Sequence, residues 1–176
     1  MTGTTGPIIG LAGYGVTGGR VAGLLLAAGS RVAVYDPAPG TTSRRSTVVR
    51  LDSADDLGSC DLVVLCQPAP HLALAEQLVN SGVAVVSLGD DLDDLKSLLE
   101  LQYVAERQGA ALVVGAGMSP GLSGLLAAHL VAQLHRVDEL HVALHGTAGP
   151  ACARQHHRAL GDTSVGWHDG VWIEPP

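Results

Sequence analysis

Hydrophobic residues over the first 134 positions fall into short unbroken runs, separated by longer stretches with helical spacing. Runs that are apolar at nearly every position, such as residues 61–66, are typical of strands buried on both faces of a parallel sheet. Six such strands are predicted, at residues 7–12, 31–36, 47–51, 61–66, 83–88 and 111–114.

Helical segments alternate with these strands. Gly29 stops a helix over 20–29, residues 71–81 form a second, and Gly89-Asp90-Asp91 caps a third that runs to about Gln108. Ser119 is expected as the N-cap of a fourth, with Pro120 in its first turn. The third and fourth helices each carry a leucine face, formed by Leu92, Leu95, Leu98 and Leu99, and by Leu122, Leu125, Leu126 and Leu130. The alternation predicts a doubly wound, mostly parallel α/β sheet with helices on both faces.

The pattern changes near His135. Residues 137–145 alternate like an amphipathic strand, and residues 163–173 predict two short strands joined through His168-Asp169-Gly170. Some forty residues cannot bury a core of their own. We therefore expect one domain at 1–135 and a short β-containing extension at 136–176, the start of a truncated substrate or dimerisation domain.

A glycine motif stands where the first strand meets the first helix: Gly13-Tyr14-Gly15-Val16-Thr17-Gly18, or G-x-G-x-x-G. Gly13 suits the tight turn, Gly15 lets a pyrophosphate approach the main chain, and Gly18 lets helix and strand pack closely. Free N–H groups at the helix N-terminus then bind the phosphates without a lysine. The six residues predict a dinucleotide site.

Asp36 ends the second strand, about where an acid hydrogen-bonds the adenosine ribose of NAD. Arg44 and Arg45 follow in a polar loop, where a guanidinium can instead grip the 2′-phosphate of NADP. NAD is the favoured cofactor, NADP stays possible, and the arginines are otherwise a solvated loop pair.

Composition narrows the class of protein. The chain is 47% hydrophobic with a net charge of −7, and it has no basic stripe with interleaved aromatic residues, which argues against disorder and against nucleic acid as a partner. Residues 110–134 lack charged side chains but are interrupted at Ser119-Pro120-Gly121, so we expect no membrane association. Three cysteines form no disulfide framework, and no signal peptide precedes the first strand, so we expect a cytoplasmic protein.

A second motif, Gly115-Ala116-Gly117-Met118-Ser119-Pro120-Gly121-Leu122-Ser123, follows the sixth strand. It is similar to the G-x-x-P-G-L-S segment of the saccharopine dehydrogenase family, and residues 82–90 match the strand that precedes it there. From Pro7 to about Leu134 the chain resembles the N-terminal NAD(P)-binding Rossmann half of that family.

The resemblance implies an oxidoreductase that acts on amino acids or their secondary-amine conjugates. It implies that Gln67, Pro68 and Ala69 border the cofactor and that residues 117–121, with Gly117 and Met118, lie by the nicotinamide and the substrate. It also implies a second, mostly antiparallel domain that supplies most substrate contacts and often a dimer interface, so a homodimer is expected.

The catalytic acid or base is not identified. His71, just past the Gln67-Pro68 loop, and Ser119 are weak candidates, and His71 is otherwise a surface residue at a helix N-terminus. His141 and His145 lie about 13 Å apart on a strand, and Cys152, His156 and His157 lack a fourth ligand, so no metal site is expected.

Three functions remain open. The first is hydride transfer between a nicotinamide and the amine or imine carbon of an amino-acid-like substrate. The second is a dinucleotide-binding sensor or regulatory module without turnover. The third is a subunit whose site forms only in an oligomer.

Overall fold

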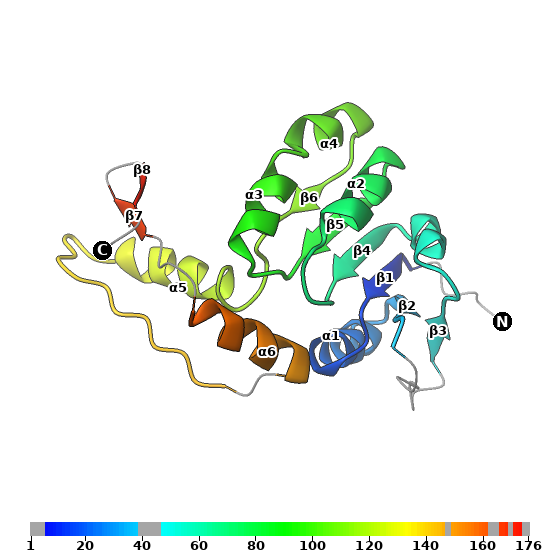
Figure 1. Cartoon of the computed structure of the whole chain (residues 1–176), viewed down its shortest axis with the longest axis horizontal. Helices are drawn as coiled ribbons and strands as arrows, with labels where there is room; N and C mark the ends of the chain where they lie inside the picture. Colours follow the sequence, from blue (N-terminus) through cyan, green and yellow to red (C-terminus); the bar gives the residue numbers. More distant parts are fainter. Residues whose placement is uncertain (1–5, 39–46, 147–148, 162–165, 169–170, 174–176) are drawn as a thin grey trace. The chain divides into compact units, whose positions relative to one another are not determined.

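The computed structural model describes residues 6–38, 47–146, 149–161, 166–168 and 171–173 (Figure 1). It divides into two compact units, Met1–His145 and Gly146–Pro176. Six parallel strands form the sheet of the first unit: β1 (Ile8–Ala12), β2 (Arg31–Tyr35), β3 (Val48–Arg50), β4 (Leu62–Leu65), β5 (Ala84–Ser87) and β6 (Leu112–Val113). All six predicted strands are present, each within two residues of its expected ends.

The strand order is β3-β2-β1-β4-β5-β6. The chain adds β2 and β3 on one side of β1, and then β4, β5 and β6 on the other side. In register, Ile9 of β1 pairs with Val32 of β2 and with Leu62 of β4. This is the order of a Rossmann fold, and it confirms the predicted doubly wound α/β class. Ligands of such sheets bind outside the carboxyl ends of the strands, where the order reverses, which here is between β1 and β4.

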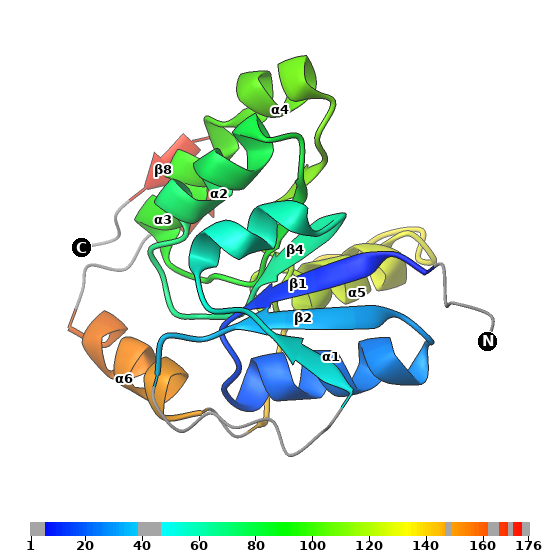
Figure 2. The same cartoon turned by 90° about the vertical axis from the view of Figure 1, so that its right-hand side faces the viewer.

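Helices cover both faces of the sheet (Figure 2). One core packs α1 (Val16–Ala27) on Leu11, Val32 and Val34. The other joins the opposite face to a 3-10 helix, η1 (Ala54–Ser59), and to α2 (Leu72–Asn80), α3 (Leu92–Leu99) and α4 (Gln102–Gln108). The helix η1 begins with a capping box between Ser53 and Asp56.

The predicted single helix from Asp91 to Gln108 is wrong in its continuity and in its buried face. It divides into α3 and α4 at Glu100 and Leu101. Leu99 is 62% exposed, whereas Asp94 is 7% exposed and faces the interior. Asp91 is the N-cap, as expected, because its carboxylate accepts the N–H of Asp94.

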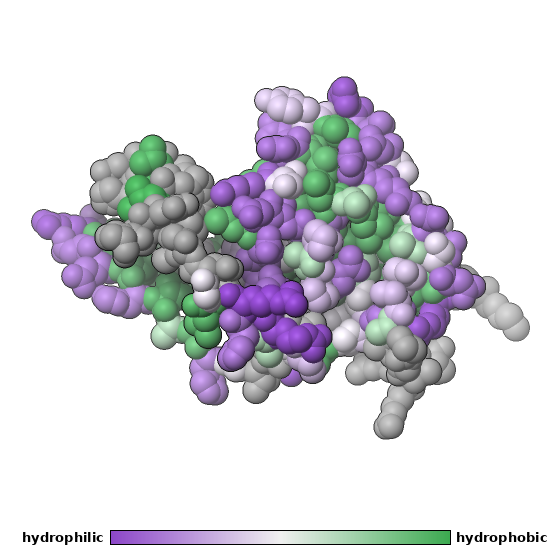
Figure 3. All heavy atoms as spheres, in the orientation of Figure 1, coloured by the Kyte–Doolittle hydropathy of each residue, from purple (hydrophilic) through white to green (hydrophobic). Residues whose placement is uncertain are grey.

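The segment after β6 also differs from expectation. The helix α5 (Leu122–Val131) begins after Gly121, not at Ser119 and Pro120, because residues 117–121 fold back on themselves and Gly121 takes a φ of 126°. None of its residues is buried, and its four leucines are exposed. Hydrophobic residues show at the surface in the region of α5 (Figure 3). Residues 137–145 form no strand.

The second unit contains α6 (Pro150–Ala159) and an antiparallel pair of strands, β7 (Gly166–His168) and β8 (Val171–Ile173). The two short strands predicted within 163–173 are therefore confirmed. The predicted boundary at 135/136 stays a prediction, while the division by contacts falls at 145/146. Within the described ranges, no helix combines the length and apolar character needed to cross a bilayer.

Candidate functional site

Two of the three motif glycines are required by the packing of the chain itself. Gly13 has a φ of 95°, and a Cβ there would lie 2.7 Å from the Gln67 nitrogen. A Cβ on Gly18, which is buried in the first turns of α1, would overlap the carbonyl oxygen of Gly13. The Gly13 N–H donates to the Tyr35 carbonyl at 2.8 Å and so holds the turn against the end of β2.

Gly15 differs from both. Its φ of −76° is open to any L residue, and a Cβ built there meets nothing within 4 Å. Gly15 is the N-cap of α1, no side chain among the described residues caps this helix, and no acid lies in its first turn. Val16 and Thr17, the first two helical residues, are exposed. Packing therefore does not require glycine here, whereas a phosphate resting on the N–H groups of α1 would.

Asp36 lies directly beside this loop. Its carboxylate accepts the N–H of Tyr14 at 2.6 Å and the N–H of Ala38 at 2.8 Å. The Arg50 guanidinium, from the end of β3, donates to the Asp36 carbonyl at 3.3 Å. The acid thus ties the glycine loop to the end of β2, on the side where an adenosine ribose is expected. Arg44 lies outside the described residues.

The loop after β4 lies on the other side of the motif. Gln67 packs its main chain against Gly13, and Cys66 lies below the loop, with its Cβ 3.5 Å from a Cβ built on Gly18. Pro68 is exposed and Ala69 half-buried. Main-chain packing thus brings Gln67 and the glycine motif together at the point where the strand order reverses.

His71 is fully buried, which overturns its reading as a surface residue. Its Nε2 lies 2.8 Å from the Gln67 carbonyl oxygen, and its Nδ1 lies 2.8 Å from the Ser87 hydroxyl. The Asp94 carboxylate accepts its main-chain N–H at 2.9 Å and that of Leu72 at 3.2 Å. Both ring nitrogens are therefore engaged by groups of the protein itself.

The 117–121 segment lies at the carboxyl ends of β5 and β6. Ala116 donates its N–H to the Ser87 carbonyl at 2.9 Å, and a Cβ on Gly117 would lie 3.1 Å from the Leu88 carbonyl oxygen. Met118 is 61% exposed and Ser119 is exposed. The segment continues from β6, which β4 and β5 separate from β1 by about 14 Å across the sheet.

The sequence pattern did not reveal the partners of His71. Ser87 lies within the predicted strand 83–88 and Asp94 within the predicted third helix, and neither was singled out by the sequence. Both are buried polar residues. Only the position of Ser87 at the end of a buried strand, at the ligand edge of such a sheet, could have drawn attention to it.

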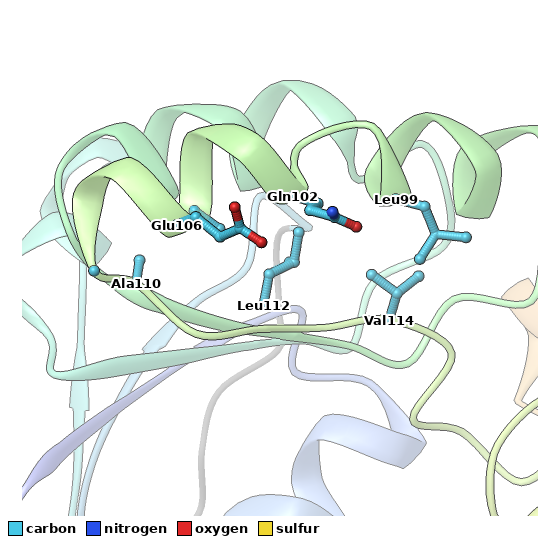
Figure 4. A pocket seen from close by; sticks show the side chains of 8 residues that line it. Leu99, Gln102, Glu106, Ala110, Leu112 and Val114 are labelled. Atoms are coloured by element: carbon cyan, nitrogen blue, oxygen red, sulfur yellow. The ribbon is translucent and has the colours of Figure 1, made fainter.

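Two further features of the first unit are the Cys66 thiol and a hollow beside the sheet edge. Burial raises the pKa of the Cys66 thiol to about 12, which keeps the thiol protonated and unreactive. A hollow of about 370 Å³ lies between α4 and the edge strand β6 (Figure 4), lined mainly by apolar residues with Gln102 and Glu106. Among the described residues, no three His, Cys, Asp or Glu side chains lie where they could share a metal ion.

No family model and no curated protein matches the chain. Solved structures do. GenD2 from gentamicin A biosynthesis, in complex with NAD, aligns with a TM-score of 0.57 and 22% identity over 72% of this chain and 39% of its own. Biliverdin reductase from Synechocystis, with biliverdin and NADP+, aligns with a TM-score of 0.56 and 22% identity over 72% and 42%. Homoserine dehydrogenase from S. aureus aligns with a TM-score of 0.51 and 18% identity over 61% of this chain and 31% of its own.

These similarities establish a Rossmann fold of the kind found in dehydrogenases and reductases. The chain spans between 31% and 42% of the length of the three solved structures. The resemblance to the saccharopine dehydrogenase family stays a prediction.

Proposed function

We propose that this chain binds a nicotinamide dinucleotide at the Gly13–Gly18 turn and belongs to an NAD(P)-dependent oxidoreductase. The observation that carries the proposal is Gly15, a glycine that neither φ nor packing requires, at a helix N-terminus without a side-chain cap. Two solved structures of the same fold are named as complexes with NAD and with NADP+.

Each part of the cofactor has a place in this proposal. The N–H groups at the start of α1 bind the pyrophosphate, and the Asp36 carboxylate binds the adenosine ribose, which favours NAD while leaving NADP possible. Gln67, Pro68 and Ala69 border the nicotinamide half, and Gly117 and Met118 lie on the substrate side. A bound nicotinamide supplies or accepts the hydride.

The substrate we propose is amino-acid-like, with hydride transfer at an amine or imine carbon, as in the saccharopine dehydrogenase family. Support comes from the Gly115–Ser123 motif and from solved structures of this fold named homoserine dehydrogenase and 3-hydroxyisobutyrate dehydrogenase with L-serine. Ser119, exposed in the turn before α5, is the remaining candidate for a polar contact with the substrate. The exposed leucines of α5 favour assembly as a homodimer.

The test is calorimetric titration of the chain with NAD, NADH, NADP and NADPH. Gly15→Ala adds one methyl group into open space, so the fold should persist while pyrophosphate binding weakens. Loss of about 1.5 to 3 kcal/mol from charge-assisted hydrogen bonds corresponds to a roughly 10- to 150-fold higher Kd.

Gly19→Ala is the matched control, because its added Cβ also meets nothing within 4 Å, one turn further along α1. It should bind as the wild type does. Absence of binding to the wild type for all four nucleotides would refute the proposal. Binding without turnover of any amino-acid-like substrate would favour the sensor or the oligomeric-site alternative.

A further inference from the structure

His71 joins the carboxyl ends of three neighbouring strands at one buried point. Its ring contacts the Gln67 carbonyl after β4 and the Ser87 hydroxyl at the end of β5, and the Ser87 carbonyl accepts the N–H of Ala116 after β6. A Cβ on Gly89 would lie 3.1 Å from the ring carbon Cε1, so the main chain after β5 closes over the imidazole.

The partners determine how the ring carries its proton. A carbonyl oxygen only accepts, so Nε2 carries the hydrogen and donates it to Gln67. The Ser87 oxygen already accepts the N–H of Gly89 at 3.2 Å, and its hydroxyl hydrogen is then directed to Nδ1. In the Nε2–H tautomer both ring nitrogens have partners, since Nε2 donates to the Gln67 carbonyl and Nδ1 accepts from the Ser87 hydroxyl. The charged group that faces the ring is Asp94, with one oxygen 3.9 Å from Nδ1.

The consequence for Gln67 is that its main chain is held from two sides. Its nitrogen and Cα pack against Gly13 of the glycine motif, while its carbonyl is held by His71. A core position could be filled by an apolar side chain without the cost of burying polar groups. What the imidazole adds is a fixed orientation for the peptide that follows Gln67.

We propose that His71 is a positioning residue for the nicotinamide half of the cofactor, acting through the Gln67 carbonyl on the loop 67–70. The inference rests on the proposed function. Asp36 places the adenosine on the β2 side of the glycine turn, so the other half of a dinucleotide extends over the ends of β4 and β5. The loop 67–70, which His71 contacts, lies at the end of β4 on the nicotinamide side. The glycine loop, which Asp36 contacts, lies on the adenosine side.

Two substitutions separate the roles of the two ring nitrogens. His71→Gln retains a donor amide at about the position of Nε2, whereas His71→Asn places its amide near Nδ1 and leaves Gln67 without a donor. Each variant is titrated with NADH and with ADP-ribose, which keeps the adenosine and the pyrophosphate but lacks nicotinamide. Circular dichroism at the titration temperature establishes that each variant is folded.

We expect His71→Asn to raise the Kd for NADH roughly two- to tenfold and to leave that for ADP-ribose unchanged, because one hydrogen bond to the loop is lost. His71→Gln should restore most of the NADH affinity. A merely structural role would weaken both ligands together.

The proposal is overturned if folded His71→Asn binds NADH as the wild type does, if both ligands weaken equally, or if His71→Gln rescues nothing. If His71→Asn does not fold, Ser87→Ala is the deciding variant, because it removes the hydroxyl that contacts Nδ1. It should again lower the affinity for NADH alone. An unchanged ratio of the Kd values for NADH and ADP-ribose overturns the inference. A wild type that binds neither ligand refutes the proposed function itself, whereas normal wild-type binding with unaltered variants refutes only the role of His71.

Discussion

Removal of the Asp94 carboxylate should destabilise the fold far more than removal of the acid beside it. Asp94 is 7% exposed, although it lies in the first turn of α3, a place where acids usually face solvent. Its oxygens accept the N–H of His71 at 2.9 Å and of Leu72 at 3.2 Å, and thereby cap α2 from a different helix. His71, the N-cap residue of α2, makes no side-chain cap itself.

Asp94→Ala leaves those two N–H groups without their acceptor in a buried setting. Each buried donor left unpaired costs about 1 to 3 kcal/mol, and here two donors lose their acceptor. Partial entry of water lowers the sum, so we expect a loss of about 2 to 4 kcal/mol in the free energy of unfolding. Asp94→Asn keeps an acceptor oxygen and should lose about 1 kcal/mol.

Urea denaturation followed by circular dichroism measures both losses. Asp93→Ala is the matched control, since its side chain is 95% exposed and its carboxylate lies 3.9 Å from the Lys96 ammonium. It should cost less than about 1 kcal/mol, from the helix dipole alone. If Asp94→Ala and Asp93→Ala shift the curve by similar amounts, the cap on α2 is not a stabilising interaction and the reasoning fails.

Three further predictions concern the glycine turn and its surroundings. Gly13→Ala should cost more stability in a thermal melt than Gly29→Ala, because both have positive φ but only Gly13 also meets neighbouring main chain; equal losses would contradict the packing argument. Asp36→Asn should shift cofactor preference towards NADP, as measured by competitive titration, and an unchanged ratio would remove Asp36 from its assigned role. Burial raises the pKa of the Cys66 thiol to about 12, so the unfolded chain ionises first as pH rises and stability falls between about pH 9 and pH 12. Cys66→Ala should lose less stability over that interval, and an equal loss would refute the assignment.

The six strands were predictable because each is a short run that is mostly apolar. The inner strands β1, β2 and β4 are largely buried, whereas the edge strands β3 and β6 expose Val49 and Val113. Asp91 was predictable as an N-cap for a similar reason, since its carboxylate acts within its own turn. Features that depend only on residues close together in the chain can therefore be predicted from one sequence.

The burial of His71 and Asp94 depends instead on residues more than twenty positions apart, and no local pattern encodes that pairing. The division between α3 and α4 has the same character, because the leucine spacing continues through Glu100 and Leu101 while Leu101 turns into the core. Only the packed sheet decides which of these side chains is buried.

In α5 the sequence instead predicted a buried leucine face that the structure leaves exposed. Leu125 and Leu126 have the spacing of a helix that packs on a core, yet they are 71% and 54% exposed. Hydrophobic spacing reports that a face is suited to burial, and it does not name the surface that buries it. The alternating pattern of 137–145 misled for the same reason, since alternation alone provides no neighbouring strand.

The three glycines of the turn also differ in what each would reveal in another sequence. Gly13 and Gly18 are demanded by the chain's own atoms, so a protein that had lost its cofactor would still need both in order to fold. Gly15 is free of that demand. Rossmann domains that keep the outer glycines but carry a side chain at the middle position should therefore fold without binding a dinucleotide at this turn. The residue at the middle position then distinguishes them from domains that do bind one there.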